Sequence, residues 1–278
     1  MSSCIFTVIK NEHEYLDEWI KYHLDLGIDH IFIFEDYDSD SHKEICYKYK
    51  HNVSLNNIFD ILDNDDKRKV IYYKRSKNLN SQDIYIKKGL LYIKKYFHKY
   101  DWCFIIDNDE FITLENNNLN DTLLQYKDYD AIILSWKCYG ANGLINKPDY
   151  NKKGIIDTYI LEAQGNIPAI NPTVLTKTCF NLKTYKEEYY KDNHQPSKEC
   201  NFCRTDLSKS RTLKIYDKLY IRHYITKSWE EYLWKIKTRG YFVGKIKTFD
   251  FFFNVNPDMY KYKEQLINEA RNINSVTI

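Results

Sequence analysis

Glycine and proline are scarce in this chain of 278 residues, which contains 8 Gly and 5 Pro. These two residues dominate turns and flexible connections, so their scarcity leaves little room for long linkers. The apolar fraction of 43% is large enough for a sizeable core. We therefore expect one domain, or one domain with a short extension.

The sequence also lacks a large excess of charge of one sign and a long apolar run. The 41 basic and 39 acidic side chains leave a net charge of +2, which argues against a general nucleic-acid-binding protein. No apolar stretch approaches the length of a membrane span, and the first residues lack the pattern of a signal peptide. The 7 cysteines are odd in number and scattered, which is typical of a reducing compartment. These features predict a soluble, cytoplasmic protein.

One cysteine pair has the spacing of metal ligands. Cys200 and Cys203 could supply two zinc ligands, and His194 just upstream could supply a third. No second pair of this kind exists, so reduced thiols are the expected state.

The most informative feature is an apolar run that ends in carboxylates. Trp102-Cys-Phe-Ile-Ile106 predicts a buried strand, and Asp107, Asp109 and Glu110 follow it. In an extended chain, residues two apart point to the same side, so Asp107 and Asp109 would project together and Glu110 to the opposite side. Adjacent carboxylates repel, and hard oxygen ligands suit Mg²⁺ or Mn²⁺ completed by substrate phosphates. The pattern favours a metal that holds a diphosphate, and a phosphatase, a nuclease or a sugar transferase could each use it.

The remaining periodicity predicts an α/β protein. Apolar strands at 4–9 and 31–34 flank a helical pattern with Asn11 as its N-cap and Gly27 at its end, which together form a parallel βαβ unit. Further elements are a strand at 70–73, a helix from about 81, strands at 131–136 and 219–224, and a helix at 228–239 with Ser228 and Glu231 as a capping box. Between 144 and 218 the periodicity weakens. We expect an N-terminal doubly wound half that continues into a C-terminal half of mixed strands.

Five ordered blocks resemble one enzyme family. They are Lys10-Asn-Glu-x-x-Tyr15-Leu-x-Glu18-Trp-Ile-x-Tyr22-His23, Gly27 with His30-Ile, Asp107-x-Asp109-Glu110-Phe, Trp136-x-x-Tyr139-Gly-x-x-Gly143, and His223-Tyr-x-x-Lys227-Ser-x-x-Glu231-x-x-x-Lys235-x-x-x-Arg239-Gly240. Their order resembles the family-2-like and family-92 glycosyltransferases. The resemblance implies the Rossmann-like GT-A fold, with a mixed, mostly parallel central sheet flanked by helices. It also implies a GT-A domain over 1–245, with a nucleotide-sugar-binding half at 1–115 and an acceptor and catalytic half at 116–245. Residues 246–278 would be an extension packed on the same domain.

The same resemblance implies a nucleotide-sugar-dependent transferase that uses Mn²⁺ or Mg²⁺ and inverts the anomeric centre. Asp109 would hold the ion directly, and Asp107 would contact the ribose, or the ion through water. His223 would supply a further metal or diphosphate contact, since a neutral imidazole is a sound ligand for Mn²⁺.

The reaction also needs a base that accepts the proton of the acceptor hydroxyl. Glu110 adjoins the metal motif, Asp157 lies where the family often has an acid followed by an aromatic residue, and Glu162 is a competitor in the same segment. We prefer Asp157.

The nucleotide should lie at the carboxyl ends of the first two strands. The candidates there are Thr7, Asn11, Glu12, Glu35 and Asp36. Gln82 matches a family position beside the donor, and Lys227 and Arg239 would add positive charge near the diphosphate. On the acceptor side the candidates are Trp136 and Tyr139, whose rings can stack on sugars, and His194. The acceptor itself, a glycan, a lipid-linked sugar or a protein, stays open.

Two other classes of function use some of these features. A metal-dependent phosphohydrolase or nucleotidyltransferase would need more acidic ligands or a glycine-rich phosphate loop, and the sequence has no such loop. A non-catalytic glycan- or nucleic-acid-binding protein could use the tyrosines and the basic C-terminal half, but it would not explain the carboxylate pair at a strand end.

Overall fold

The computed structural model describes residues 1–9, 13–35, 40–65, 67, 81–115, 118–163, 176–205, 219–239 and 249–275. Of residues 40, 81, 82, 238, 239 and 272–275 it describes the backbone alone. The chain forms two compact units. Unit 1 consists of 1–137 with 171–222, and unit 2 consists of 138–170 with 223–278. The functional halves expected from the sequence stay predictions.

Within the described residues, nine strands form one sheet in the order β3-β2-β1-β4-β7-β6-β9-β5, with β8 beside β6. The strands are β1 (Ser3–Ile9), β2 (His30–Glu35), β3 (Val53–Asn57), β4 (Trp102–Ile105), β5 (Glu110–Leu114), β6 (Ala131–Tyr139), β7 (Thr176–Asn181), β8 (Phe202–Arg204) and β9 (Leu219–Tyr224). The predicted α/β class with a mixed sheet and flanking helices is confirmed.

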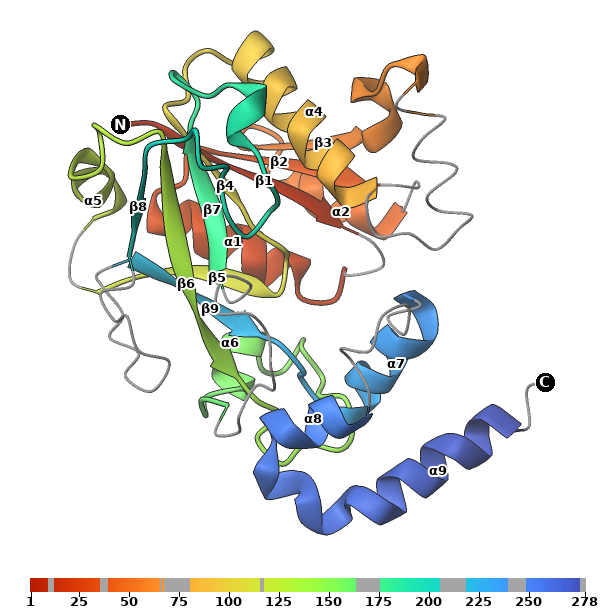
Figure 1. Cartoon of the computed structure of the whole chain (residues 1–278). Helices are drawn as coiled ribbons and strands as arrows, with labels where there is room; N and C mark the ends of the chain where they lie inside the picture. The colour runs from red at the N-terminus through yellow and green to blue at the C-terminus, as the bar shows by residue number, and fades with distance from the viewer. Residues whose placement is uncertain are drawn as a thin grey trace. The chain divides into compact units, whose positions relative to one another are not determined.

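The order in which the chain adds strands to the sheet reverses at β1. From β1 it runs to β2 and β3 on one side, and it then crosses to β4 on the other side, with all four strands parallel (Figure 1). β7 inserts antiparallel between β4 and β6. In such sheets ligands collect at the carboxyl ends of the strands where the order reverses, which here are the ends of β1 and β4.

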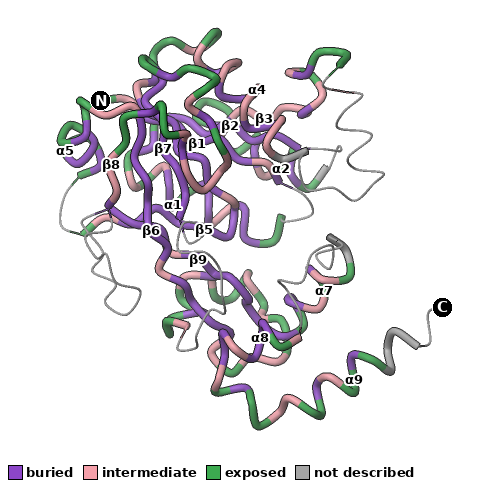
Figure 2. The backbone as a smooth tube through the Cα atoms, viewed as in Figure 1, coloured by how far each residue is buried: buried purple, intermediate pink, exposed green. Residues whose placement is uncertain are grey.

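Helices cover both faces of the parallel strands in unit 1. α4 (Ser81–Tyr96) packs Ile86 and Leu90 on a core that includes Phe6 and Phe34. α1 (Leu16–Leu26) lies on the opposite face, with Trp19 and His23 buried. Figure 2 shows that the strands of this sheet are buried almost throughout. The other helices of unit 1 are α2 (Asp40–Lys48), η1 (Ile58–Ile61), α5 (Leu119–Leu124) and η3 (Glu187–Tyr189).

The ends of α1 only partly follow the sequence prediction. Gly27 ends the helix with φ of 105°, a left-handed conformation that glycine adopts at no steric cost. The predicted start with Asn11 as cap is wrong, because α1 begins at Leu16 and its N-cap, Tyr15, makes no side-chain cap bond. The apolar positions that pack on the sheet set this start. Asn11 itself lies outside the described residues.

Unit 2 contains mainly helices: α6 (Ile155–Thr158), α7 (Trp229–Arg239), α8 (Phe249–Val255), η4 (Pro257–Tyr262) and α9 (Lys263–Ser275). Trp229 packs on Phe252 and Phe253, with ring centroids 4.9 and 5.3 Å away. The predicted helix near 228–239 is confirmed, together with its capping box, because Ser228 N donates to Glu231 Oε2 and Glu231 N donates to Ser228 Oγ.

The sequence prediction missed β7 and β8, which lie in the stretch where the periodicity weakens. β7 carries Lys177 in the middle of the sheet, and a lysine does not fit the apolar pattern of a buried strand. The predicted strand at 70–73 lies outside the described residues. None of the helices in the described part of the chain has the length and apolar character that crossing a membrane requires.

Candidate active site

The acidic motif forms a tight turn directly after β4. Glu110 N donates to Asp107 O at 3.1 Å, and Glu110 Oε2 accepts from Asp107 N at 3.0 Å. The extended conformation assumed for residues 107–109 is therefore wrong, while the projection of Asp107 and Asp109 to the same side stays a prediction. The turn also overrides strand alternation, because the Glu110 carboxylate folds back to the Asp107 backbone. Asp107 is half-buried, while Asp109 and Glu110 are buried.

Lys177 of β7 meets this turn from the neighbouring strand. Its Nζ lies 2.7 Å from Asp107 Oδ2 and 3.6 Å from Glu110 Oε2, and the side chain is 1% exposed. Burial disfavours the charge on Lys177, but Asp107 and Glu110 more than offset this effect and raise its pKa above the ordinary value. Burial raises the pKa of Glu110 well above its usual range, although Lys177 opposes this shift. Sequence reasoning missed Lys177, and its only signal was a lysine inside an otherwise uncharged segment.

Two predicted acceptor residues adjoin the same lysine. Lys177 Nζ lies 5.9 Å from the centroid of the Trp136 ring, and the Trp136 and His194 rings form a T-shaped pair with 5.4 Å between their centroids. His194 Nδ1 lies 2.7 Å from Thr176 O. Burial, together with the charge of Lys177, lowers the pKa of His194, so its imidazole is neutral at pH 7. Unit 1 thus brings Asp107, Glu110, Trp136 and His194 together around Lys177.

Helix α1 fixes the backbone that follows the turn. Trp19 Nε1 donates to Glu110 O at 2.7 Å, and the Tyr22 hydroxyl donates to Ile112 O at 2.8 Å. Ile112 N donates to His23 Nε2 at 3.2 Å, so Nδ1 carries the proton of the neutral ring and donates to Trp19 O at 2.8 Å. Burial lowers the pKa of His23 to about 3, which keeps this tautomer neutral. The block 10–23 therefore positions the turn through three of its side chains.

The predicted nucleotide residues of unit 1 are only partly described. Thr7 lies at the carboxyl end of β1, just past the β1–β4 pair Phe6–Ile105, and is buried. In the described part of the chain its Oγ1 has no hydrogen-bond partner. Glu35 is buried at the end of β2, with its Oε2 2.8 Å from His42 Nδ1. Asn11, Glu12 and Asp36 lie outside the described residues, as do the side chains of Gln82 and Arg239.

Unit 2 holds the predicted base and the remaining predicted contacts. Tyr139 forms an isolated antiparallel bridge with Glu162, and both Asp157 and Glu162 are exposed. His223 is buried at the end of β9. Lys227 is also buried, and its φ of 55° is a left-handed conformation that residues with side chains rarely adopt.

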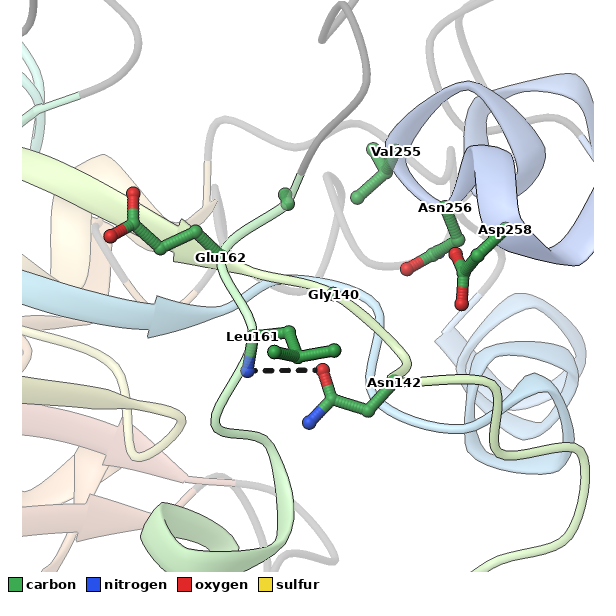
Figure 3. Close-up of a pocket in the computed structure, with 8 residues that line it drawn as sticks. Gly140, Asn142, Leu161, Glu162, Val255, Asn256 and Asp258 are labelled. Atoms are coloured by element: carbon green, nitrogen blue, oxygen red, sulfur yellow. Dashed lines mark hydrogen bonds between the residues drawn. The ribbon is translucent and has the colours of Figure 1, made fainter.

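Glu162 lines a pocket of unit 2 with Gly140, Asn142, Leu161, Ala163, Val255, Asn256 and Asp258. Figure 3 shows Asn142 turned to the backbone of Leu161, whose N–H it accepts at 3.2 Å, while the Glu162 carboxylate extends away from Asn256 and Asp258. Asn256 Oδ1 accepts from Ala141 N, which fixes the wall beside Gly140. The pocket has the polar groups to bind hydroxyls. It does not decide whether Asp157 or Glu162 is the base.

Unit 2 contains a buried carboxylate network around Glu231. The sequence predicted only one part of it, the capping box of Ser228 and Glu231. Glu231 accepts from the hydroxyls of Tyr150 at 2.6 Å and Tyr159 at 2.7 Å, and from Ser228 Oγ at 2.8 Å. Burial alone would raise the pKa of Glu231, but the charge of Lys227 and these hydrogen bonds hold it below the ordinary value. Glu231 thus anchors the start of α7, beside Lys227.

The turn offers a hard cation the carboxylates of Asp107 and Asp109. Among the described residues, no three or more His, Cys, Asp or Glu side chains are grouped as a metal site, so His194, Cys200 and Cys203 of unit 1 are not grouped as zinc ligands. The cysteines are free thiols. Asp107 and Asp109 are nevertheless the donor type that Mg²⁺ or Mn²⁺ takes with substrate phosphates. The residues therefore fit an ion whose coordination a diphosphate completes.

Comparison with known proteins gives loose structural similarities. No protein-family model matches the chain, and no curated protein matches it. The chain is similar to the crystal structure of TarS 1-349 from S. aureus, with 13% identity, a TM-score of 0.42, and coverage of 95% of this chain and 73% of that one. It is also similar to the mannosyltransferase Ktr4p from S. cerevisiae, with 14% identity, a TM-score of 0.30, and coverage of 53% and 40%.

A third similarity is to glucosyl-3-phosphoglycerate synthase from Mycobacterium tuberculosis, a structure in complex with Mn²⁺, UDP and glucosyl-3-phosphoglycerate. The identity is 10% and the TM-score 0.33, and the match covers 66% of this chain and 57% of that one. At these identities and TM-scores the similarities assign neither a family nor an activity to the chain.

Proposed function

We propose that this protein is a glycosyltransferase of the GT-A type that moves a sugar from a nucleoside diphosphate to an acceptor hydroxyl. The observation that carries the proposal is the acidic turn of Asp107 and Asp109 at the carboxyl end of β4. This end lies beside the end of β1, where the strand order reverses and where open α/β sheets bind ligands. The ordered sequence blocks around the turn support the same assignment.

Sugar transfer breaks the bond between the anomeric carbon and the diphosphate, and the leaving group takes the electron pair. A bound Mn²⁺ or Mg²⁺ would neutralise the charge that develops on the diphosphate. Asp107 and Asp109 would hold such an ion, and Thr7 and Glu35 at the neighbouring strand ends are the proposed contacts to the nucleoside. The donor is proposed to be a UDP-sugar.

Inversion requires a carboxylate that accepts the proton as the acceptor oxygen bonds to the anomeric carbon. Glu110 is fully buried and its Oε2 accepts from the Asp107 backbone, which supports a positioning role for it. Asp157 and Glu162 are exposed to solvent, which leaves them accessible, so they are the proposed bases. Lys227, Arg239 and His223 are proposed diphosphate or metal contacts, and Trp136, Tyr139 and His194 are proposed acceptor contacts.

Thermal unfolding with and without ligands tests the proposal. UDP with Mn²⁺ should raise the melting temperature, and UDP with a chelator should not. A melting temperature that no nucleoside diphosphate raises in the presence of Mn²⁺ would contradict it. A panel of nucleotide sugars, assayed for hydrolysis with Mn²⁺, would then identify the donor.

Substitutions assign the roles. Asp109→Asn should abolish sugar transfer and leave the circular dichroism spectrum unchanged, whereas Asp25→Asn, an exposed carboxylate of α1, should keep wild-type turnover. Asp157→Asn and Glu162→Gln are made one at a time. The base is the residue whose substitution causes the larger loss of kcat. Full turnover in Asp109→Asn would remove this residue from the mechanism.

A further inference from the structure

Lys177 contacts both Asp107 and Glu110 through ion pairs. The 1% exposed ammonium lies 2.7 Å from Asp107 Oδ2 and 3.6 Å from Glu110 Oε2. Burying a charged lysine costs free energy of desolvation unless a carboxylate compensates its charge. The sheet therefore places a permanent positive charge against the carboxylate to which the proposed function assigns a metal ion.

The position of this charge is fixed from both sides. β7 pairs with β6, with Lys177 opposite Leu134, and with β4, with Cys179 opposite Phe104. The Trp136 ring lies 5.9 Å from Nζ. Since two strands hold the backbone and the side chain is buried, the ammonium cannot leave the turn as an exposed lysine would.

We propose that Lys177 is a resident cation of the acidic turn, and that it makes the turn bind a divalent ion together with a nucleoside diphosphate rather than alone. The inference rests on the proposed function and adds a positioning residue to it. A divalent ion that approaches Asp107 and Asp109 meets a fixed like charge nearby, and burial limits the screening of that repulsion. The phosphates of a nucleotide bring negative charge that offsets both cations, so metal and nucleotide favour each other.

A purely structural role for Lys177 predicts the opposite sign. If the lysine only held the turn in shape, its removal would disorder the carboxylates and weaken the binding of a divalent ion. If it competes with the ion, its removal exposes the full charge of the carboxylates and strengthens binding. The sign of the change therefore separates the two roles.

Isothermal titration with Mn²⁺ alone, at low salt and pH 7, tests the inference. Lys177→Met should bind Mn²⁺ about tenfold more tightly than the wild type, because one like charge is gone. Lys177→Arg keeps the charge and should bind as the wild type does. Lys183→Met is the matched control, because it removes the same charge from a lysine that is 69% exposed and paired with Asp101. Unchanged or weaker Mn²⁺ binding in a folded Lys177→Met would overturn the inference.

A measurement on the wild type covers the case in which Lys177→Met does not fold. The Kd for Mn²⁺, corrected for the complex that Mn²⁺ forms with UDP in solution, should fall about tenfold or more when UDP is present. Equal affinity with and without UDP would overturn the inference, although the proposed function would stand as long as UDP binds. If UDP does not bind at all, the proposed function fails, and the comparison of Mn²⁺ binding in the Lys177 variants still decides the inference.

Discussion

The Lys177 ammonium and the Asp107 carboxylate lie 2.7 Å apart although 70 residues separate them in the chain. The contact joins the antiparallel strand β7 to the turn at the end of the parallel strand β4. It links the stability of the sheet to the geometry of the candidate site, because the same carboxylate that would serve a ligand compensates a buried charge. The following predictions start from this and similar contacts.

Asp107→Asn should lower the free energy of unfolding by about 2 kcal/mol, because it removes the nearest carboxylate from the buried Lys177 and leaves Glu110 at the longer distance of 3.6 Å. A wholly buried pair that loses one partner costs about 3–5 kcal/mol, but Asp107 is 40% exposed and water replaces part of the contact. Urea unfolding followed by circular dichroism measures the loss. Asp25→Asn, which breaks the exposed pair with Lys21, should change stability by less than about 0.5 kcal/mol. Equal effects of the two substitutions would contradict the buried contact.

The neutral His23 predicts a specific dependence of stability on pH. Its pKa is about 3 in the folded protein and about 6.5 in the unfolded chain, so the unfolded chain takes up the proton first as the pH falls. The free energy of unfolding should therefore fall by about 2.5 kcal/mol from this residue between pH 7 and pH 4.5, and the contribution is complete above pH 6.5. Urea unfolding across this range should show a shallower slope for His23→Gln than for the wild type. His98→Gln, at an exposed position, should keep the wild-type slope.

Tyr159→Phe removes one hydroxyl from the buried Glu231 network. The variant should lose about 1.5–3 kcal/mol, the range for a hydrogen bond to a charged group, since Tyr159 is fully buried. Tyr260→Phe is the matched control, because its hydroxyl bonds to Asn254 at an exposed position, and its stability should stay within about 0.5 kcal/mol of the wild type. Thermal and urea unfolding of both variants would reveal whether the Glu231 network stabilises unit 2.

Gly89 of α4 has no room for a side chain. A Cβ atom there would lie 2.0 Å from the Phe6 ring of β1, so Gly89→Ala should destabilise the protein by about 2 kcal/mol, despite a gain of about 1 kcal/mol in helix propensity. The double variant Gly89→Ala with Phe6→Leu should be more stable than the sum of the two single changes predicts. Strict additivity would show that α4 does not approach β1 in this way.

Local patterns in the sequence predicted the elements around the site. The apolar runs of β1, β2 and β4, the C-cap Gly27 and the capping box of Ser228 and Glu231 are all found where their spacing places them. Each depends on neighbours within one helix or strand, which is why the sequence reveals it. The acidic motif was found for the same reason, but its conformation was not, because hydrogen bonds within the turn replace the extended geometry assumed for Asp107 and Asp109.

The sequence by itself determined the α/β class, the order of the main elements and the residues of the acidic turn. The tertiary structure alone decided that Lys177 meets Asp107, that His23 holds Ile112, and that Trp136 and His194 lie beside the same lysine. These contacts join residues of different strands and helices, such as His23 and Ile112, which are 89 positions apart in the chain. Their energy comes from burial and hydrogen bonding that exist only once the sheet has formed, so no local pattern records them.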